Sequence, residues 1–277
     1  MNTGVAMRGG RLRARRAARG SAVEAAARAG LTARGVIYLL VGVLALQIAF
    51  GESRREADRS GALQEISDKP FGAVVLWALG LGLVGMALWR LSEAVFGAAG
   101  KNGRSWRKRL MAAARCVFYA FTAYSVLSFA AGAGGGESSD SQSRDITAKA
   151  LQAPAGQWLV GAAGAGIVLG GVWIAGRAAL RKYRDKMKTG EMSRPVRRAV
   201  DVTGVGGGVA RGVLFAVAGA FAVQAAVDYE PGKAKGMDDT LRSFSETPAG
   251  PWLLVLIAAG LVLFGLFSFA MARWRRV

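Results

Sequence analysis

The chain has 277 residues, a net charge of +19 and a hydrophobic fraction of 52%. It contains no histidine, which excludes a Ser-His-Asp triad, a histidine-ligated zinc site and a histidine-ligated haem. Its single cysteine, Cys116, excludes an internal disulfide. A basic and apolar chain fits either a nucleic-acid binder or a membrane protein, so the arrangement of the charges has to decide between them.

Six apolar runs have the length of a membrane-spanning helix, which needs about 20 residues to cross the hydrocarbon core. They carry few charges and lack the polar face that a surface helix of a soluble protein would show. In a soluble protein, six such helices would leave no amphipathic helices to cover them. We therefore predict six transmembrane helices, over residues 31–50, 71–89, 110–131, 158–175, 209–227 and 251–272.

Lysine and arginine gather on one side of these predicted helices. The four segments on that side hold 28 of the 37 Lys and Arg residues, and they are residues 1–35, 90–115, 177–211 and 273–277. Because short loops rich in Lys and Arg stay in the cytoplasm, we predict that both termini are cytoplasmic. The net charge then encodes orientation. Only Trp106 is interleaved with a cationic cluster, so we predict no nucleic-acid partner.

The chain repeats one pattern three times. Each copy has an arginine near the start of its first apolar run and a Pro-x-Gly motif before its second, and these are 36, 39 and 37 residues apart. Repeats that share one orientation are related by an axis along the membrane normal. We therefore predict an all-α integral membrane protein, in which three parallel two-helix repeats form a pseudo-threefold bundle of six helices. The motifs are Ala33-Arg34-Gly35, Ala114-Arg115-Cys116 and Ala210-Arg211-Gly212, with Pro70-Phe71-Gly72, Pro154-Ala155-Gly156 and Pro248-Ala249-Gly250.

The repeat also sets the expected organisation of the chain. We expect each proline to open a helix, and a short helix to lie on the outer face before it, because apolar residues there are three or four apart. These residues are Leu63 and Ile66, Ile146 and Ala150, and Leu241 and Phe244. The predicted segments are a disordered basic cytoplasmic tail (1–21), repeat 1 (22–100), repeat 2 (101–182), a cytoplasmic linker (183–198) and repeat 3 (199–277).

These motifs make the chain resemble the bacterial membrane protein family known as domain of unknown function 1206. The resemblance covers about residues 22–275 and is weakest in the second repeat, where Cys116 replaces the glycine. It implies three tandem two-helix repeats and a bacterial inner-membrane location. It implies no activity and no catalytic residues.

Arg34, Arg115 and Arg211 recur a few residues inside the predicted cytoplasmic end of the first helix of each repeat. One interpretation is that they are anchors whose side chains extend to the membrane surface and fix the depth of the helices. The other is that they form a ring of guanidinium groups, which would bind the phosphate of an anionic lipid or solute. The sequence leaves both open.

Other small and polar residues recur with the repeat. Gln47 and Gln224 lie 13 residues after their arginines and Ser128 holds the same place in the second repeat; they either hydrogen-bond between helices or line a polar cavity. Glycines at regular spacing predict seams of close helix packing. These glycines are Gly35, Gly42, Gly166, Gly170, Gly212 and Gly219.

We expect a protein without enzymatic activity, cofactor or metal site, because the loops are too short for a catalytic domain. The function we expect is that of a scaffold or a partner- or lipid-binding bundle in the bacterial cytoplasmic membrane. Its partners would be anionic phospholipids at the cytoplasmic face and another membrane protein. The alternative is a channel or carrier for a small neutral or anionic solute or lipid. Glu93, three residues after Arg90, is expected to form a local ion pair with it.

Overall fold

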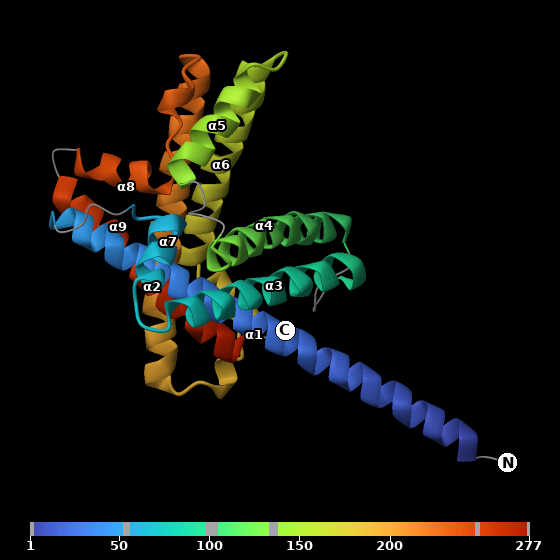
Figure 1. The fold of residues 1–277 in the computed structure, drawn as a ribbon. Coiled ribbons are helices and arrows are strands. Elements are labelled where there is room, and N and C mark those ends of the chain that lie inside the picture. Colours follow the sequence, from blue (N-terminus) through green and yellow to red (C-terminus); the bar gives the residue numbers. More distant parts are fainter. Residues whose placement is uncertain (1–2, 52–55, 98–104, 133–137, 247–249, 276–277) are drawn as a thin grey trace.

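A computed structural model describes the chain except residues 1–2, 52–55, 98–104, 133–137, 247–249 and 276–277, and it describes side chains from residue 21 onward. The described residues form nine α-helices and three short 3-10 helices, with one isolated β-bridge between Met187 and Arg275 (Figure 1). The prediction of an all-helical fold is confirmed.

Six helices are long and apolar enough to cross a membrane, and each coincides with one of the six predicted runs. At the end rich in Lys and Arg each helix extends beyond its apolar run, because alanine and arginine form helix readily. The backbone of the first helix is thus already helical from Thr3, where the sequence led us to expect a disordered tail. The six helices are α1 (Thr3–Ala49), α3 (Gly72–Phe96), α4 (Trp106–Ala130), α6 (Gly156–Ala179), α7 (Arg194–Val227) and α9 (Gly250–Trp274).

Three short helices precede the Pro-x-Gly motifs, as expected: α2 (Arg59–Ser67), α5 (Ser139–Leu151) and α8 (Met237–Ser245). Leu63 of α2 and Leu241 of α8 are buried against the long helices. In α5 the buried face is shifted, so that Leu151 is buried and Ile146 is exposed. The extra turn of α5 changes which of its residues face inward.

After the first two motifs the long helix begins at the glycine, not at the proline. Pro248 and Ala249 of the third motif lie outside the described residues. The residue before the glycine adopts a left-handed backbone conformation, with φ of 63° at Phe71 and 58° at Ala155. A Cβ atom on Gly72 or Gly156 would lie 2.1 Å from a carbonyl oxygen of the preceding short helix. The motif therefore makes a tight reversal that has no room for a side chain at the glycine.

The most extensive helix contacts join neighbouring repeats: α3 packs on α4, α6 on α7, and α9 on α1. Within repeats, α1 packs on α3 and α7 packs on α9. The two helices of repeat 2 are different, because α4 runs beside α3 and α6 runs beside α7 in another direction (Figure 1). The predicted pseudo-threefold ring of six helices is therefore open between α4 and α6.

Glycines allow the closest of these contacts. Gly35 and Gly42 of α1 face α9, and a Cβ on Gly42 would lie 2.8 Å from a backbone nitrogen there. Gly212 and Gly219 of α7 face α6, where a Cβ on either would lie within 3.0 Å of backbone atoms. Close backbone approach of this kind is how small residues join helices in membranes.

The predicted pair on α6 does not take part in this seam. A Cβ added to Gly166 or Gly170 would meet nothing within 4 Å. The residues of α6 that approach α7 are Gly164 and Gly171, which share the seven-residue spacing of Gly212 and Gly219. Gly166 and Gly170 lie on another face of the helix and leave that face open.

Three buried aspartates join the short helices of the three repeats in a closed circuit. Asp58, before α2, accepts a hydrogen bond from the first backbone N–H of α5 at 2.7 Å. Asp140 of α5 accepts one from a backbone N–H of α8 at 3.2 Å. Asp238 of α8 accepts one from the backbone N–H of Ala57, just before α2, at 2.7 Å. The repeats are thus connected in cyclic order at this end of the molecule.

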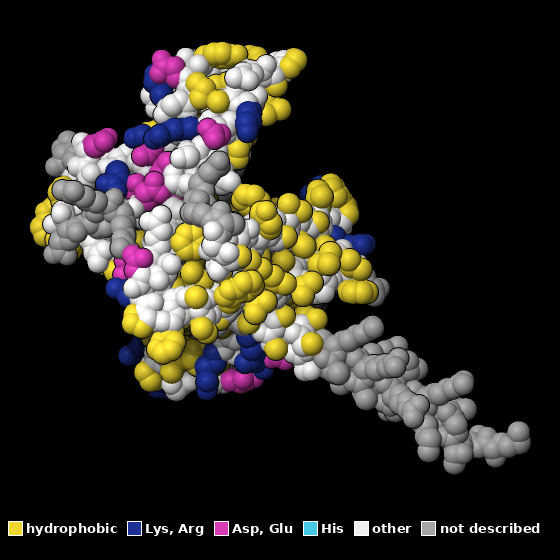
Figure 2. Space-filling view, in the orientation of Figure 1, with side chains coloured by type: hydrophobic (Ala, Val, Ile, Leu, Met, Phe, Trp, Pro, Cys, Tyr) yellow, Lys and Arg dark blue, Asp and Glu magenta, His cyan; other side chains and the backbone are white. Residues whose placement is uncertain are grey.

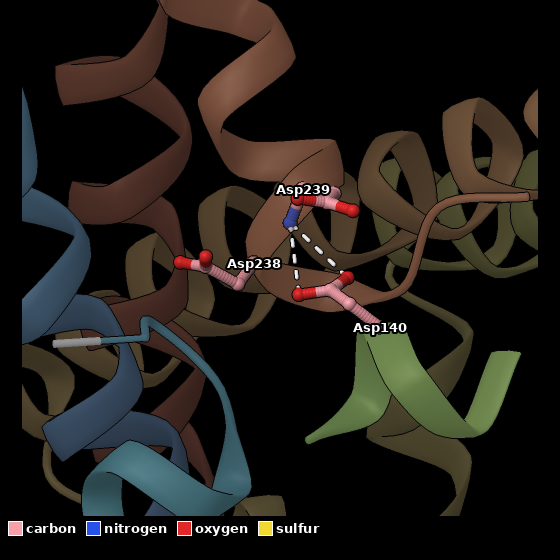
Figure 3. Close-up of side chains that lie close together, drawn as sticks. All are labelled: Asp140, Asp238 and Asp239. Carbon is pink, nitrogen blue, oxygen red and sulfur yellow. Dashed lines mark hydrogen bonds between the residues drawn. The ribbon is translucent and has the colours of Figure 1, made fainter. Parts of the chain in front are cut away.

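Figure 3 shows the part of this circuit between α5 and α8. Asp140, Asp238 and Asp239 have carboxylate oxygens within 4.8 Å of one another. Asp238 also accepts a hydrogen bond from Arg242 at 2.7 Å, and Asp239 forms an ion pair with Arg144. Hydrogen bonds and ion pairs inside the protein therefore account for the cluster as a structural junction.

We expect Gly156→Ala to lower the apparent Tm of the protein in detergent. Its Cβ would meet the carbonyl oxygen of Ala150 at 2.1 Å, and forcing the reversal open should cost roughly 1–3 kcal/mol. Gly166→Ala is the matched control, because its Cβ meets nothing within 4 Å and alanine favours helix. Equal effects of both substitutions on the Tm would contradict this explanation of the motif.

The Asp140 carboxyl makes the stability of the junction depend on pH. Burial, with repulsion from Asp239, Asp238 and Asp58, raises the pKa of Asp140 to about 6 from its ordinary value of 3.8. The folded state therefore binds a proton between these values, and stability increases as the pH falls from 6 towards 4. Between pH 7 and pH 5 the wild type should gain roughly 1 kcal/mol relative to Asp140→Asn, measured by thermal unfolding. A parallel pH profile for the two proteins would contradict it.

Candidate anion-binding site

Arg34 of α1 and Arg211 of α7 lie together inside the bundle, where both are half-buried, and we call them the inner arginine pair. Their guanidinium carbons are 5.2 and 5.0 Å from the ring centroid of Phe264 on α9. Arg34 Nε donates a hydrogen bond to the hydroxyl of Ser268 at 3.2 Å. Arg211 Nε donates one to the hydroxyl of Tyr38 at 2.9 Å. The packing of α1, α7 and α9 thus brings two of the three predicted arginines together.

The inner arginine pair has aromatic and hydroxyl neighbours, but among the described residues no carboxylate pairs with either guanidinium. The Nη2 atom of Arg34 is buried without a hydrogen-bond partner. Tyr119 of α4 lies close to Arg34. The positive charge of Arg211 is near enough to repel that of Arg34. Aromatic faces offset part of the cost of burying these charges. Taking a cation partly out of water without a carboxylate partner still raises the free energy of the folded state.

A second group of cations lies where α3 ends. Arg90 is 5% exposed, and it forms the expected ion pair with Glu93 at 2.5 Å, while its Nε atom has no partner. The guanidinium carbons of Arg90 and Arg275 lie 4.1 and 4.6 Å from the ring centroid of Trp89. Arg115, the third predicted arginine, lies beside Arg90 and Glu93 on the neighbouring α4. Among the described residues, the carboxylate of Glu93 is the one that lies near these three arginines.

A cavity of about 250 Å³ opens beside this group, between α4, α6, α7, α9 and the short 3-10 helix Lys182–Lys186. Its apolar wall includes Trp173, Phe264 and Phe267. We call it the basic cavity, because the described residues that line it include no carboxylate and five cations: Arg115, Arg177, Lys182, Lys186 and Arg275.

Repulsion between the cations contributes to a lower pKa for two of them, Lys186 and Arg275. Burial lowers the pKa of Lys186, and the nearby charges of Arg275 and Arg115 lower it further. Burial, with repulsion from Arg90 and Arg34, lowers the pKa of Arg275 to about 9. A bound anion would relieve this repulsion. Because guanidinium groups match phosphate oxygens in bidentate geometry, a phosphate group suits this lining.

The predicted polar residues at the other end of the first helices are not brought together. Gln47 and Gln224 are exposed and Ser128 is half-buried, each on a different helix. Exposed glutamines of this kind do not form a shared buried cavity. The basic cavity lies at the arginine end instead.

Arg90, Lys186 and Arg275 were not among the site residues predicted from the sequence. The spacing of the repeat could have identified Arg90. Arg90 and Ser268 both lie 20 residues after the proline of their repeat, and each lies against the arginine of the next repeat around the bundle, Arg115 or Arg34. Lys186 and Arg275 come from the linker and the end of the last helix, outside the repeated pattern.

Comparisons with known proteins support the threefold organisation. The family described as "Domain of Unknown Function (DUF1206)" matches three tandem segments, over residues 29–97, 110–181 and 206–275. An uncharacterized protein of Bacillus subtilis (strain 168), YxxB, is 30% identical over 243 residues, which are 87% of each chain. No solved structure matches the chain. The chain belongs to the DUF1206 family, and it carries the three repeats of that family in tandem.

Proposed function

We propose that this protein is a non-enzymatic multi-pass protein of the bacterial cytoplasmic membrane, with both termini in the cytoplasm, and that its basic cavity binds a phosphate-bearing ligand. Six apolar helices and the hydrophobic surface over α3 and α4 in Figure 2 support a membrane location. The Lys and Arg asymmetry supports the orientation. The observation that carries the binding function is the lining of five cations and no carboxylate, with unpaired buried guanidinium nitrogens behind it.

A binding role suits the chemistry of the site better than catalysis. The lining offers five cations, which can hold an anion, and its described residues include neither a carboxylate nor a histidine to act as a general base. The same cluster would sit at the cytoplasmic membrane surface, where anionic phospholipids concentrate. A scaffold that recognises lipid or a membrane-protein partner through this end is consistent with these properties.

The alternative is a channel or carrier for a small solute or lipid. A channel needs a continuous polar path, whereas buried leucines fill the contacts between α1, α7 and α9: Leu44, Leu214, Leu254 and Leu261. This packing favours the binding role.

Inorganic phosphate should stabilise the purified protein in detergent. At a phosphate concentration tenfold above Kd, the gain is about 1.4 kcal/mol, or roughly 2–4 °C in Tm. Arg115→Gln with Lys186→Gln should abolish this gain, because both side chains line the basic cavity. Arg197→Gln with Arg198→Gln is the matched control, because it removes the same charge from exposed positions outside the lining. No phosphate effect on the wild type, or an equal loss in both variants, would contradict the proposal.

The orientation has its own test in spheroplasts, with single cysteines in a Cys116→Ala background. Gln152→Cys, at the end of α5, should react with a membrane-impermeant maleimide in intact spheroplasts. Gly190→Cys, in the linker after α6, should react only after permeabilisation. Both positions are exposed, so reactivity reports the side of the membrane. The reverse pattern would overturn the orientation.

A further inference from the structure

The gap between α4 and α6 is a departure from the threefold pattern that needs an occupant. In repeats 1 and 3 the two long helices of the repeat pack on each other, as α1 does on α3 and α7 does on α9. In repeat 2 the helices α4 and α6 run in different directions (Figure 1), and each packs mainly on a helix of another repeat. The basic cavity lies at one end of this gap, because Arg115 of α4 lines it together with Ile174 and Arg177 of α6.

The face of α6 that leads away from the basic cavity is apolar and open. Gly166, Gly170, Ile174 and Arg177 follow one another at intervals of four, four and three residues, which places them on one side of a helix. The last two line the cavity. A Cβ on either glycine would meet nothing within 4 Å, so no other part of the described protein covers this side of α6, which we call the open glycine face.

The opposite wall of the gap is apolar as well. Phe118 lies one turn beyond Arg115 on α4 and is 62% exposed. Trp173, which lines the basic cavity from α6, is 65% exposed. A cationic end and an apolar continuation therefore lie next to each other in one gap, between helices of membrane-spanning length.

Unsatisfied donors mark the cationic end as a place for a ligand. Arg90, nine-tenths buried, has a guanidinium Nε atom without a partner, and so does Arg275 at the cavity wall. Buried polar atoms in proteins are normally hydrogen-bonded. Arg275 lines the basic cavity, and Arg90 lies against the same Trp89 ring as Arg275.

We infer that the gap holds one phospholipid molecule, which enters sideways from the bilayer between α4 and α6. Its phosphate lies among Arg115, Lys186 and Arg275, and an acyl chain lies along the Gly166 and Gly170 face of α6. This inference rests on the proposed function, since it names the ligand class of the same cavity. It accounts for the cations, the open glycine face and the separation of α4 from α6 together.

A phospholipid fits these observations better than a free phosphate ion or a partner helix. A free ion would use the cations and would leave the apolar gap without an occupant. A helix of another protein would fill the gap but would need a carboxylate placed to meet five cations. A phospholipid supplies a phosphate and an acyl chain in one molecule, at the depth where charged and apolar surfaces meet.

The two parts of the site can be separated by experiment. The protein is reconstituted in nanodiscs of phosphatidylglycerol and phosphatidylcholine, and native mass spectrometry measures the retained phosphatidylglycerol. Gly170→Leu places a leucine side chain on the open glycine face of α6 and should reduce the amount of retained phosphatidylglycerol about tenfold. Gly176→Leu is the matched control, because it adds the same side chain to a glycine of α6 that also has nothing within 4 Å and lies on a different face.

The gain in Tm with inorganic phosphate distinguishes the possible failures. Gly170→Leu should keep this gain, which also shows that the variant is folded, while Arg115→Gln with Lys186→Gln should lose both the gain and the lipid. Unchanged lipid retention in Gly170→Leu would overturn the placement of the acyl chain and leave the proposed function standing. The absence of both phosphate stabilisation and lipid retention in the wild type would overturn the two together.

Discussion

The constraint on which this fold depends is that a single two-helix repeat cannot bury its own faces. Each repeat passes its second long helix to the next repeat, so that α3 packs on α4, α6 on α7 and α9 on α1. Glycines set the distance of two of these contacts, in α1 and α7. The aspartate circuit of α2, α5 and α8 connects the repeats in the same cyclic order. The order of the repeats is therefore held twice, by apolar packing in the long helices and by hydrogen bonds in the short ones.

Because packing between repeats holds the bundle, packing within a repeat is free to vary. Repeat 2 uses this freedom: α4 and α6 each stay with a neighbour from another repeat and separate from each other (Figure 1). The cations that the repeats share then face a gap instead of a closed interface. Arg34 and Arg211 remain inside the bundle, whereas Arg115 of the open repeat lies at the wall of the basic cavity. One repeated arginine therefore has different surroundings in the three repeats.

The sequence predicted what depends on local pattern. Apolar runs located the six long helices, and the spacing of arginine and Pro-x-Gly located the repeats. The sequence did not reveal which faces meet, because that depends on partners distant in the chain: Gly166 and Gly170 have the spacing of a packing seam, but Gly164 and Gly171 form it. For the same reason, the sequence predicted only part of the site. Repetition identified Arg34, Arg115 and Arg211, whereas Lys186 and Arg275 reach the cavity only through the path of the linker and the last helix.

In the proposed arrangement, the cations at this end of the bundle hold the phosphate of a lipid that keeps α4 and α6 apart. The most direct measurement is a cryo-EM structure of the protein in nanodiscs that contain phosphatidylglycerol. We expect headgroup density between Arg115, Lys186 and Arg275, with an acyl chain continuing along Gly170 and Gly166. A closed ring in which α4 packs on α6, with no density in the basic cavity, would contradict it.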